Sequence, residues 1–140
     1  FCKINFSPSS LKQVIKKISV IMEQKMDCIF CRIIAGEIPS EKVLETDEIL
    51  AFRDINPAAP EHILIVPKKH IQYLEDATGS DIEILGKLFL TARDIAKLLS
   101  VEKNGYRLIL NNGKAAGQEG FHLHLHLLGG KESLGPMLTR

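Results

Sequence analysis

Residues 121–128 read Phe-His-Leu-His-Leu-His-Leu-Leu, and this alternation decides how the chain folds. Side chains of a β-strand point alternately to the two faces of its sheet, so residues two apart share a face. Three histidines therefore project together, about 6.6 to 7 Å apart, while the leucines between them face the other way. The histidines are His122, His124 and His126. The pattern predicts a strand with a buried leucine face and an imidazole row lining a site, because packing does not explain three alternating histidines.

Two chemistries fit such a row of imidazoles. Histidines at i and i+2 of a strand can ligate zinc, whereas a neutral imidazole can attack phosphorus and form a covalent intermediate. In the second case flanking imidazoles, protonated near neutral pH, would stabilise the phosphate oxygens. The preceding loop, residues 111–120, carries three glycines and several polar amides, which let backbone N–H groups cradle an anion. A purely metal-binding site would not need this loop, so it favours phosphoryl chemistry.

Outward from the histidine row, the sequence predicts four more strands and one long helix. The strands are expected at residues 42–45, 48–53, 62–66 and 106–110, before the fifth at 121–128. Ser80 and Glu83 form a capping-box pattern, and the helix that it opens should end near Asn104-Gly105. These elements predict an α+β fold, with a mostly antiparallel sheet of about five strands and the helix on one face.

Composition limits the class of protein. The 140 residues are 45% hydrophobic and 25% charged, the balance of one soluble globular domain. The net charge of +1 gives no overall basic field, so a nucleic-acid partner is not expected. No apolar run approaches the roughly 18 to 20 residues that span a bilayer, so no membrane partner is expected. Three cysteines do not form a disulfide framework, which indicates a reducing compartment and a cytoplasmic protein.

Residues 1–25 differ from the rest in charge, because five lysines and one acid give them a net charge of +4. Apolar residues recur there at helical spacing: Leu11, Val14, Ile15, Ile18 and Met22. This predicts a basic amphipathic helix, which fits an organellar presequence, a membrane-surface helix or an upstream extension docked on the domain. Met26 would be a natural start for the domain, so we divide the chain into an extension, residues 1–25, and one domain, residues 26–140.

Further motifs surround the histidine row. They are Cys-Ile-Phe-Cys-Arg-Ile-Ile (28–34), Glu-Ile-Pro (37–39), Ala-Phe-Arg-Asp-Ile (51–55), Pro-Glu-His (60–62), Val-Pro-Lys-Lys-His (66–70) and residues 111–130, with the Leu-Leu-Gly-Gly tail. Across about residues 27–138 the chain resembles the histidine-triad (HIT) superfamily, most of all its Hint branch of nucleotide-binding purine nucleoside phosphoramidases. The resemblance implies a HIT-like fold and a homodimer with one continuous sheet, in which the tail near Met137 lies close to the partner's site.

The resemblance also implies roles for individual residues. His124 would be the nucleophile, and the other catalytic histidines would be His122, His126 and His62. Phosphate contacts are implied for His126, Gln118, Asn111 and the backbone of Gly117. Contacts with the ribose hydroxyls are implied for Asp54, and an apolar slot for the base is implied for Phe30, Ile33, Phe52 and Ile55, although Phe52 alone fits core packing equally well. Glu119 stands where many animal members carry serine, which leaves the preferred leaving group open.

Cys28 and Cys31 have metal-ligand spacing, but a lone pair is half a site. The resemblance supplies His62 and His122 as the remaining ligands of a structural zinc. The alternative is two buried thiols that behave as small hydrophobes. We interpret His70 as a surface or helix-start residue and assign no role to Cys2.

The function that the resemblance implies is hydrolysis of the P–N bond of adenosine 5′-phosphoramidates. The resemblance implies that a nucleotidyl-histidine intermediate would form without a catalytic metal and that purine nucleoside monophosphates such as AMP and GMP would bind. Alternatives are a dinucleoside polyphosphate hydrolase, a nucleotidyl transferase, a non-catalytic nucleotide-binding or partner-interaction protein, and a structural zinc protein.

Overall fold

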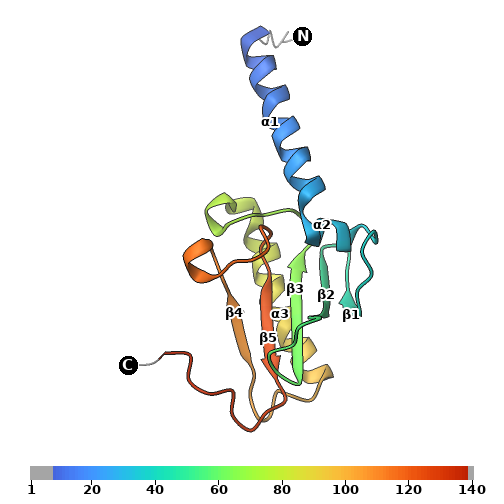
Figure 1. Ribbon diagram of the computed structural model, residues 1–140, viewed down its shortest axis with the longest axis vertical. Coiled ribbons are helices and arrows are strands. Elements are labelled where there is room, and N and C mark those ends of the chain that lie inside the picture. Colours follow the sequence, from blue (N-terminus) through green and yellow to red (C-terminus); the bar gives the residue numbers. More distant parts are fainter. Residues whose placement is uncertain (1–7, 139–140) are drawn as a thin grey trace.

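The computed structural model describes residues 8–138, and its centre is a five-stranded antiparallel sheet (Figure 1). The helices are α1 (Pro8–Asp27), α2 (Ile29–Ile34) and α3 (Ile82–Leu98), with 3₁₀ turns η1 (Leu74–Asp76), η2 (Gly79–Asp81) and η3 (Lys114–Ala116). The strands are β1 (Lys42–Glu45), β2 (Ile49–Arg53), β3 (Glu61–Pro67), β4 (Arg107–Leu110) and β5 (Leu125–Gly129). They lie in the order β1-β2-β3-β5-β4, so the predicted α+β fold is confirmed.

Both faces of the sheet are covered, which explains the unbroken apolar runs 49–52 in β2 and 63–67 in β3. Helix α3 packs on one face, where it meets alternate residues of three strands: Ile49, Ala51, Ile63, Ile65, Leu125 and Leu127. The residues between them face the opposite side, where α2 packs against Leu50, Phe52, Leu64 and Val66. β3 pairs with β5 so that Leu64 lies opposite His126, which places that histidine on the α2 face.

Helix α3 is amphipathic as predicted, and its buried positions follow helical spacing: Leu88, Ala92, Ile95 and Ala96. Its ends differ from the prediction. Thr78 and Asp81 form the reciprocal capping box around η2, so the Ser80–Glu83 box was wrong. The helix ends at Leu98 rather than near Asn104-Gly105, because Ser100 turns left-handed with φ 57°. The N–H groups of Ser100 and Val101 close the last turn on Lys97 and Ala96, a Schellman motif with serine in the usual glycine position.

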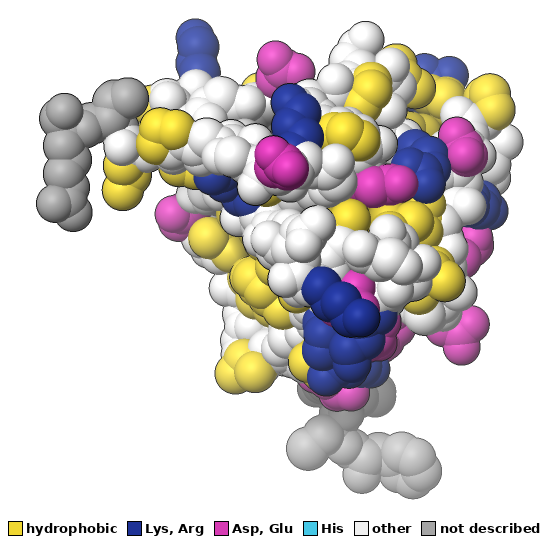
Figure 2. All heavy atoms as spheres, turned by 90° about the horizontal axis from the view of Figure 1, so that it is seen from below, with side chains coloured by type: hydrophobic (Ala, Val, Ile, Leu, Met, Phe, Trp, Pro, Cys, Tyr) yellow, Lys and Arg dark blue, Asp and Glu magenta, His cyan; other side chains and the backbone are white. Residues whose placement is uncertain are grey.

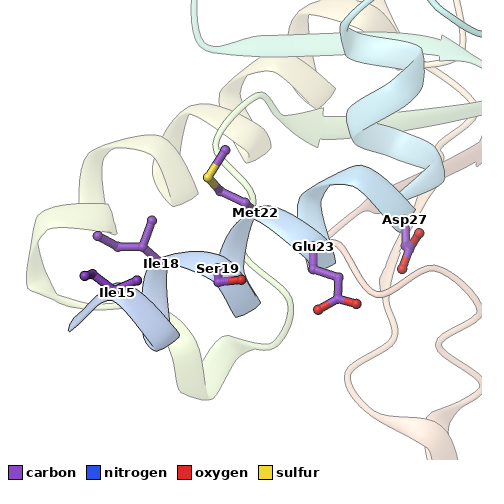
Figure 3. A pocket seen from close by; sticks show the side chains of 6 residues that line it. All are labelled: Ile15, Ile18, Ser19, Met22, Glu23 and Asp27. Atoms are coloured by element: carbon purple, nitrogen blue, oxygen red, sulfur yellow. The ribbon is translucent and has the colours of Figure 1, made fainter. Parts of the chain in front are cut away.

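Helix α1 forms as predicted but extends away from the sheet, meeting the rest of the chain near α2 (Figure 1). Its apolar stripe is open, because Leu11, Ile15 and Met22 are 51%, 57% and 60% exposed. The stripe therefore does not dock on the domain. A shallow hollow of about 760 Å³ runs along α1 and is lined by Ile15, Ile18, Ser19, Met22, Glu23 and Asp27 (Figure 3). Among the described residues, none of the helices is long and apolar enough to span a bilayer.

On the face shown in Figure 2, acidic and basic side chains are interspersed, and none of the described histidines is visible there. The histidines are withdrawn into the molecule, since His122, His124 and His62 are only 0%, 5% and 7% exposed. Five buried or half-buried histidines between α2 and the sheet therefore define the region in which to look for chemistry.

Candidate active site and metal cluster

The three histidines of the row lie on the α2 side, although only His126 belongs to a strand. β5 begins at Leu125 rather than at residue 121. The pairing of β3 with β5 ends at Ile65 and Leu125, two residues before Pro67, which has no N–H to extend a ladder. The N–H of Leu123 instead donates to the carbonyl of Ile71, 2.6 Å away. The histidine rings still meet, because those of His124 and His126 lie 5.0 Å apart, centre to centre.

His124 is held in one orientation by the backbone. Its Nδ1 lies 2.8 Å from the carbonyl oxygen of His122. A carbonyl only accepts, so Nδ1 carries the proton and, in the neutral ring, Nε2 keeps the lone pair. The ring of Phe30 packs against it at a centroid distance of 4.8 Å. The predicted nucleophile is thus a buried imidazole whose tautomer leaves Nε2 free to attack.

A second group brings together Asp54, His62 and His126, whose ligand-type atoms lie within 4.8 Å of one another. His62 Nε2 is 2.9 Å from His126 Nδ1 and 3.5 Å from Asp54 Oδ2. Burial, with smaller effects from His124 and His62, lowers the pKa of His126 to about 4. Burial also lowers the pKa of His62, partly opposed by the charge of Asp54. Both shifts favour neutral rings, so they oppose the protonated imidazole that was expected from the sequence beside the phosphate.

The loop before the row is organised by Gln118. This buried side chain accepts from the N–H of Gly113 at 2.7 Å and donates to the carbonyls of Gln72 and Gly120. Both of its N–H donors are used, so in this structure Gln118 shapes the loop instead of offering a donor to phosphate. Gly117 adopts φ 79°, a left-handed conformation that favours glycine. Asn111 is half-buried at the start of this loop.

Gly120 is required by a close approach. A Cβ added there would lie 2.3 Å from Cε2 of Phe30, the ring that packs on His124. Glu119 beside it is exposed and lines a hollow of about 270 Å³, together with Asp27, Cys28, Ile29, His70, Gln72, Gly120 and Phe121. An open space therefore adjoins the loop at the position that the resemblance relates to the leaving group.

The predicted base slot is only partly open. Three of its residues are buried in the core between α2 and the sheet: Phe30, Ile33 and Phe52 are 7%, 8% and 4% exposed. Ile55, in contrast, is 92% exposed. Ile55 lines a hollow of about 460 Å³ that also contains Glu41, Arg53, Asp54, Pro57, Pro60 and His62. Asp54 reaches this hollow and accepts from the N–H of Asn56 at 2.8 Å. The accessible part of the predicted nucleoside site is therefore the Asp54–Ile55 end.

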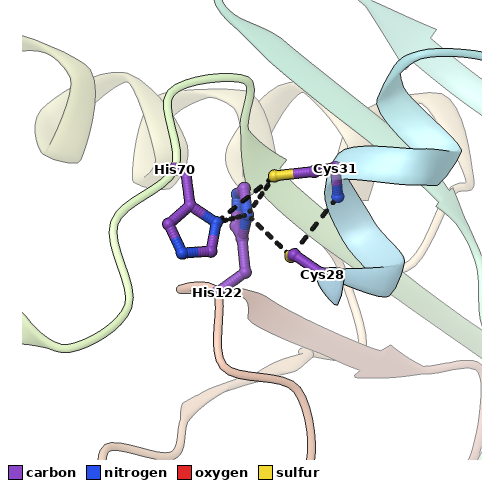
Figure 4. A group of neighbouring side chains, drawn as sticks. All are labelled: Cys28, Cys31, His70 and His122. Carbon is purple, nitrogen blue, oxygen red and sulfur yellow. Dashed lines mark hydrogen bonds between the residues drawn. The ribbon is translucent and has the colours of Figure 1, made fainter. Parts of the chain in front are cut away.

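The cysteine pair meets two histidines in a compact cluster (Figure 4). His122 Nδ1 lies 3.5 Å from Cys28 Sγ and 3.6 Å from Cys31 Sγ. His70 Nδ1 lies 3.3 Å from Cys31 Sγ and 3.1 Å from His122 Nδ1. A tetrahedral zinc with usual bond lengths spaces such atoms about 3.3 to 3.8 Å apart. Three of these distances lie in that range and the distance between the two histidine nitrogens is slightly shorter, so the four residues fit a Cys₂His₂ metal site.

The fourth residue of this cluster corrects the sequence prediction. His62 was expected to complete the ligand set, but it lies beside His126 and Asp54. His70, interpreted as a surface residue, takes its place. His122 is prepared as a ligand because Nε2 donates to the carbonyl of Pro67 at 2.7 Å, which leaves Nδ1 unprotonated in the neutral ring. Burial lowers the pKa of His122 to about 4, so the ring is neutral at pH 7.

This arrangement, two histidine clusters on one face of a five-stranded sheet, is that of a histidine-triad protein. Residues 35–133 match the HIT domain family, and the chain belongs to that family. It is 46% identical over 113 residues to the purine nucleoside phosphoramidase of Escherichia coli K12, covering 81% of this chain and 94% of the relative. It is 46% identical over 103 residues to Protein HitA of Neisseria gonorrhoeae, covering 74% of this chain and 95% of the relative.

Solved structures agree with this assignment. A histidine triad protein from Clostridium difficile superposes with a TM-score of 0.76 at 48% identity, covering 79% of this chain and 96% of that one. A HIT family hydrolase from Legionella pneumophila superposes with a TM-score of 0.73 at 48% identity, covering 75% of this chain and 94% of that one. The chain is thus a HIT-family protein of the Hint-like branch, and its relatives support a nucleotide hydrolase.

Proposed function

We propose that the chain hydrolyses the P–N bond of purine nucleoside 5′-phosphoramidates through a nucleotidyl intermediate on His124. The observation that carries the proposal is the 2.8 Å contact between His124 Nδ1 and the His122 carbonyl, which leaves the Nε2 lone pair available. The name of the relative from Escherichia coli, a purine nucleoside phosphoramidase, supports the choice of bond.

In the proposed reaction, His124 Nε2 forms a bond to the α-phosphorus and the P–N bond of the substrate breaks. The electron pair of that bond leaves on the amine nitrogen, which takes a proton from solvent water as it departs. Water then attacks phosphorus, the bond to His124 breaks, and the nucleoside monophosphate leaves with release of the proton from water. Covalent catalysis of this kind divides one difficult displacement into two easier ones.

Other residues would hold the substrate. Asp54 would accept from the ribose hydroxyls, and the exposed Ile55 beside it would contact the base. His126, next to the nucleophile, would contact phosphate oxygens together with backbone N–H groups of the loop around Gly117. The open hollow beside Glu119 would receive the leaving amine.

We also propose a zinc ion on Cys28, Cys31, His70 and His122. The spacing of the four ligand atoms and the hydrogen bond from His122 to Pro67 support this choice. Four protein ligands would leave no open position, so the zinc would stabilise the fold and take no part in the reaction. The thiolates and neutral imidazoles would link α2 to the segments that follow β3 and precede β5.

A homodimer is the assembly that we propose. β4 lies at one edge of the sheet, so a second copy could extend the sheet there. Arg107 of β4 donates to the carbonyls of Leu134 and Gly135, which ties the C-terminal tail to the same edge. The tail would therefore reach the partner where the two sheets join.

The covalent intermediate gives a direct test. The protein is mixed with adenosine 5′-phosphoramidate, quenched within one turnover and digested for mass analysis. We expect AMP on the peptide that carries His124, and a His124→Ala variant that binds AMP but turns over at least about 1,000-fold more slowly. Bound AMP without turnover in the unchanged protein would favour a non-catalytic binding protein. Faster turnover of diadenosine polyphosphates than of the phosphoramidate would favour the polyphosphate hydrolase.

A further inference from the structure

Two histidine rings meet edge to edge beside the nucleophile, and their contact requires a definite proton. His62 Nε2 and His126 Nδ1 are 2.9 Å apart, a distance at which two nitrogens share one hydrogen. A neutral imidazole carries a proton on one nitrogen only, so one of the two rings must donate and the other accept. Which ring donates determines what the far side of His126 can offer to a ligand.

The backbone settles the direction of this hydrogen bond. The N–H of Ala58 donates to His62 Nδ1 at 3.0 Å. A backbone N–H can only donate, so Nδ1 of His62 must be the nitrogen with the lone pair. In the neutral ring the proton is then on Nε2, which faces His126. His126 Nδ1 therefore accepts, and its own proton is on Nε2.

We propose that His62 is a positioning residue that holds His126 in the Nε2–H tautomer, so that His126 donates a hydrogen bond to a phosphoryl oxygen of the bound nucleotide. The catalytic consequence rests on the proposed function, but the tautomer does not. Asp54 competes weakly for the same proton, because its Oδ2 lies 3.5 Å from His62 Nε2 against 2.9 Å for His126. The low pKa of His126, caused mainly by burial, keeps the accepting nitrogen free of a proton at neutral pH.

The two neighbouring histidines would then have opposite tautomers for opposite tasks. A backbone carbonyl, that of His122, places the proton of His124 on Nδ1 and leaves Nε2 as a nucleophile. A backbone N–H, that of Ala58, acts through His62 and places the proton of His126 on Nε2. The backbone N–H of Ala58, in the loop between β2 and β3, thus controls the position of a proton on His126 through His62.

Nitrogen NMR tests the tautomer directly. Protein labelled with ¹⁵N-histidine, with its zinc retained, is recorded at pH 7, and long-range proton–nitrogen correlations report which ring nitrogen is protonated. A His126→Gln variant assigns the signals. We expect Nε2–H rings for both His62 and His126 and an Nδ1–H ring for His124. An Nδ1–H or doubly protonated His126 would overturn the proposal, whether or not the chain hydrolyses phosphoramidates.

Two variants of His62 separate positioning from packing. His62→Gln can present an amide N–H where the Nε2–H stood, whereas His62→Met fills similar space without a donor. We expect His62→Met to lower kcat about 10- to 100-fold, less than the roughly 100- to 1,000-fold for removing a donor to a developing charge itself, with a similar Kd for AMP. We expect His62→Gln to recover most of kcat and the Nε2–H signal of His126. Equal kcat values for the two variants would overturn the proposal.

A conservative control lies across the sheet. Ile109 of β4 pairs with His126 from the other side, so Ile109→Val changes its packing but no hydrogen bond. We expect the tautomer of His126 and kcat to be unchanged in this variant. A loss of the Nε2–H signal in Ile109→Val would show that packing, and not His62, selects the tautomer. Absence of turnover in every variant and in the unchanged protein would refute the proposed function while the NMR result stands separately.

Discussion

The two histidine clusters use the two nitrogens of the imidazole ring in different ways. In the cluster of Cys28, Cys31, His70 and His122, ring nitrogens and sulfurs converge at distances suited to a common ion. In the cluster of Asp54, His62 and His126, two nitrogens approach to 2.9 Å and share a proton. The difference arises from the second nitrogen of each ring. His122 donates its other N–H to a carbonyl, so Nδ1 can bind metal, while His62 accepts from Ala58, so Nε2 carries a proton.

His122 links the metal cluster to His124, the proposed nucleophile. The side chain of His122 lies with the cysteines, while its backbone carbonyl accepts from His124 Nδ1. A displacement of His122 would therefore also move the carbonyl that orients His124. The metal cluster is therefore joined through His122 to the proposed nucleophile, so a structural zinc would also affect turnover.

The largest effect is expected from breaking the metal cluster. Cys31→Ala should lose the bound zinc and lower the free energy of unfolding by about 4 kcal/mol, the linkage expected when free zinc exceeds its dissociation constant about a thousandfold. Turnover should fall as well, because His122 would no longer be held. Zinc per chain by atomic absorption, thermal unfolding and kcat are measured together. Cys2→Ala is the control and should keep the ion; equal zinc content in the two variants would refute the site.

A smaller effect is expected where the loop approaches the nucleophile. Gly120→Ala should displace the ring of Phe30, since the new Cβ would lie 2.3 Å from Cε2, and overpacking costs about 1 to 3 kcal/mol. Because Phe30 packs against His124, kcat should fall without loss of zinc. Gly86→Ala in α3 is the matched control: nothing lies within 4 Å of its added Cβ, so stability should rise by about 0.5 to 1 kcal/mol. Equal stability in the two variants would contradict the close approach.

Some features of the fold could be predicted from the sequence, and others could not. Period-two alternation in residues 121–128 placed the three histidines on one face, and apolar runs located β2 and β3, because both signals depend only on local chain geometry. The start of β5 at Leu125 was missed because it depends on where the pairing with β3 ends, which the local sequence of β5 does not contain. Helix α3 ended early because Ser100 adopts a conformation that is usual for glycine.

The fourth metal ligand could have been found from an antiparallel register. If His126 pairs with Leu64, then His122 lies near the far end of β3, next to the chain that leads to His70. His62 stands at the opposite end of β3, so it could not reach the cysteines. The proton on His62 was beyond sequence reasoning, since it is decided by the N–H of Ala58 in an irregular loop.

The smallest effect is a decrease in the free energy of unfolding at low pH, and it distinguishes the two clusters. The folded pKa of His126 is lowered to about 4 from an ordinary 6.5, so between these pH values the unfolded chain binds the proton and the folded chain does not. The free energy of unfolding should therefore decrease as pH falls through this window. Replacing the ring in His126→Gln should remove about 1 kcal/mol of that decrease between pH 6.5 and 5, a figure discounted for the partial exposure of the side chain. Denaturant unfolding of both proteins at the same zinc concentration gives the difference, because the contribution of the metal cluster cancels. An unchanged slope in the variant would assign the acid sensitivity to the metal cluster, where His122 also has a pKa lowered to about 4 by burial.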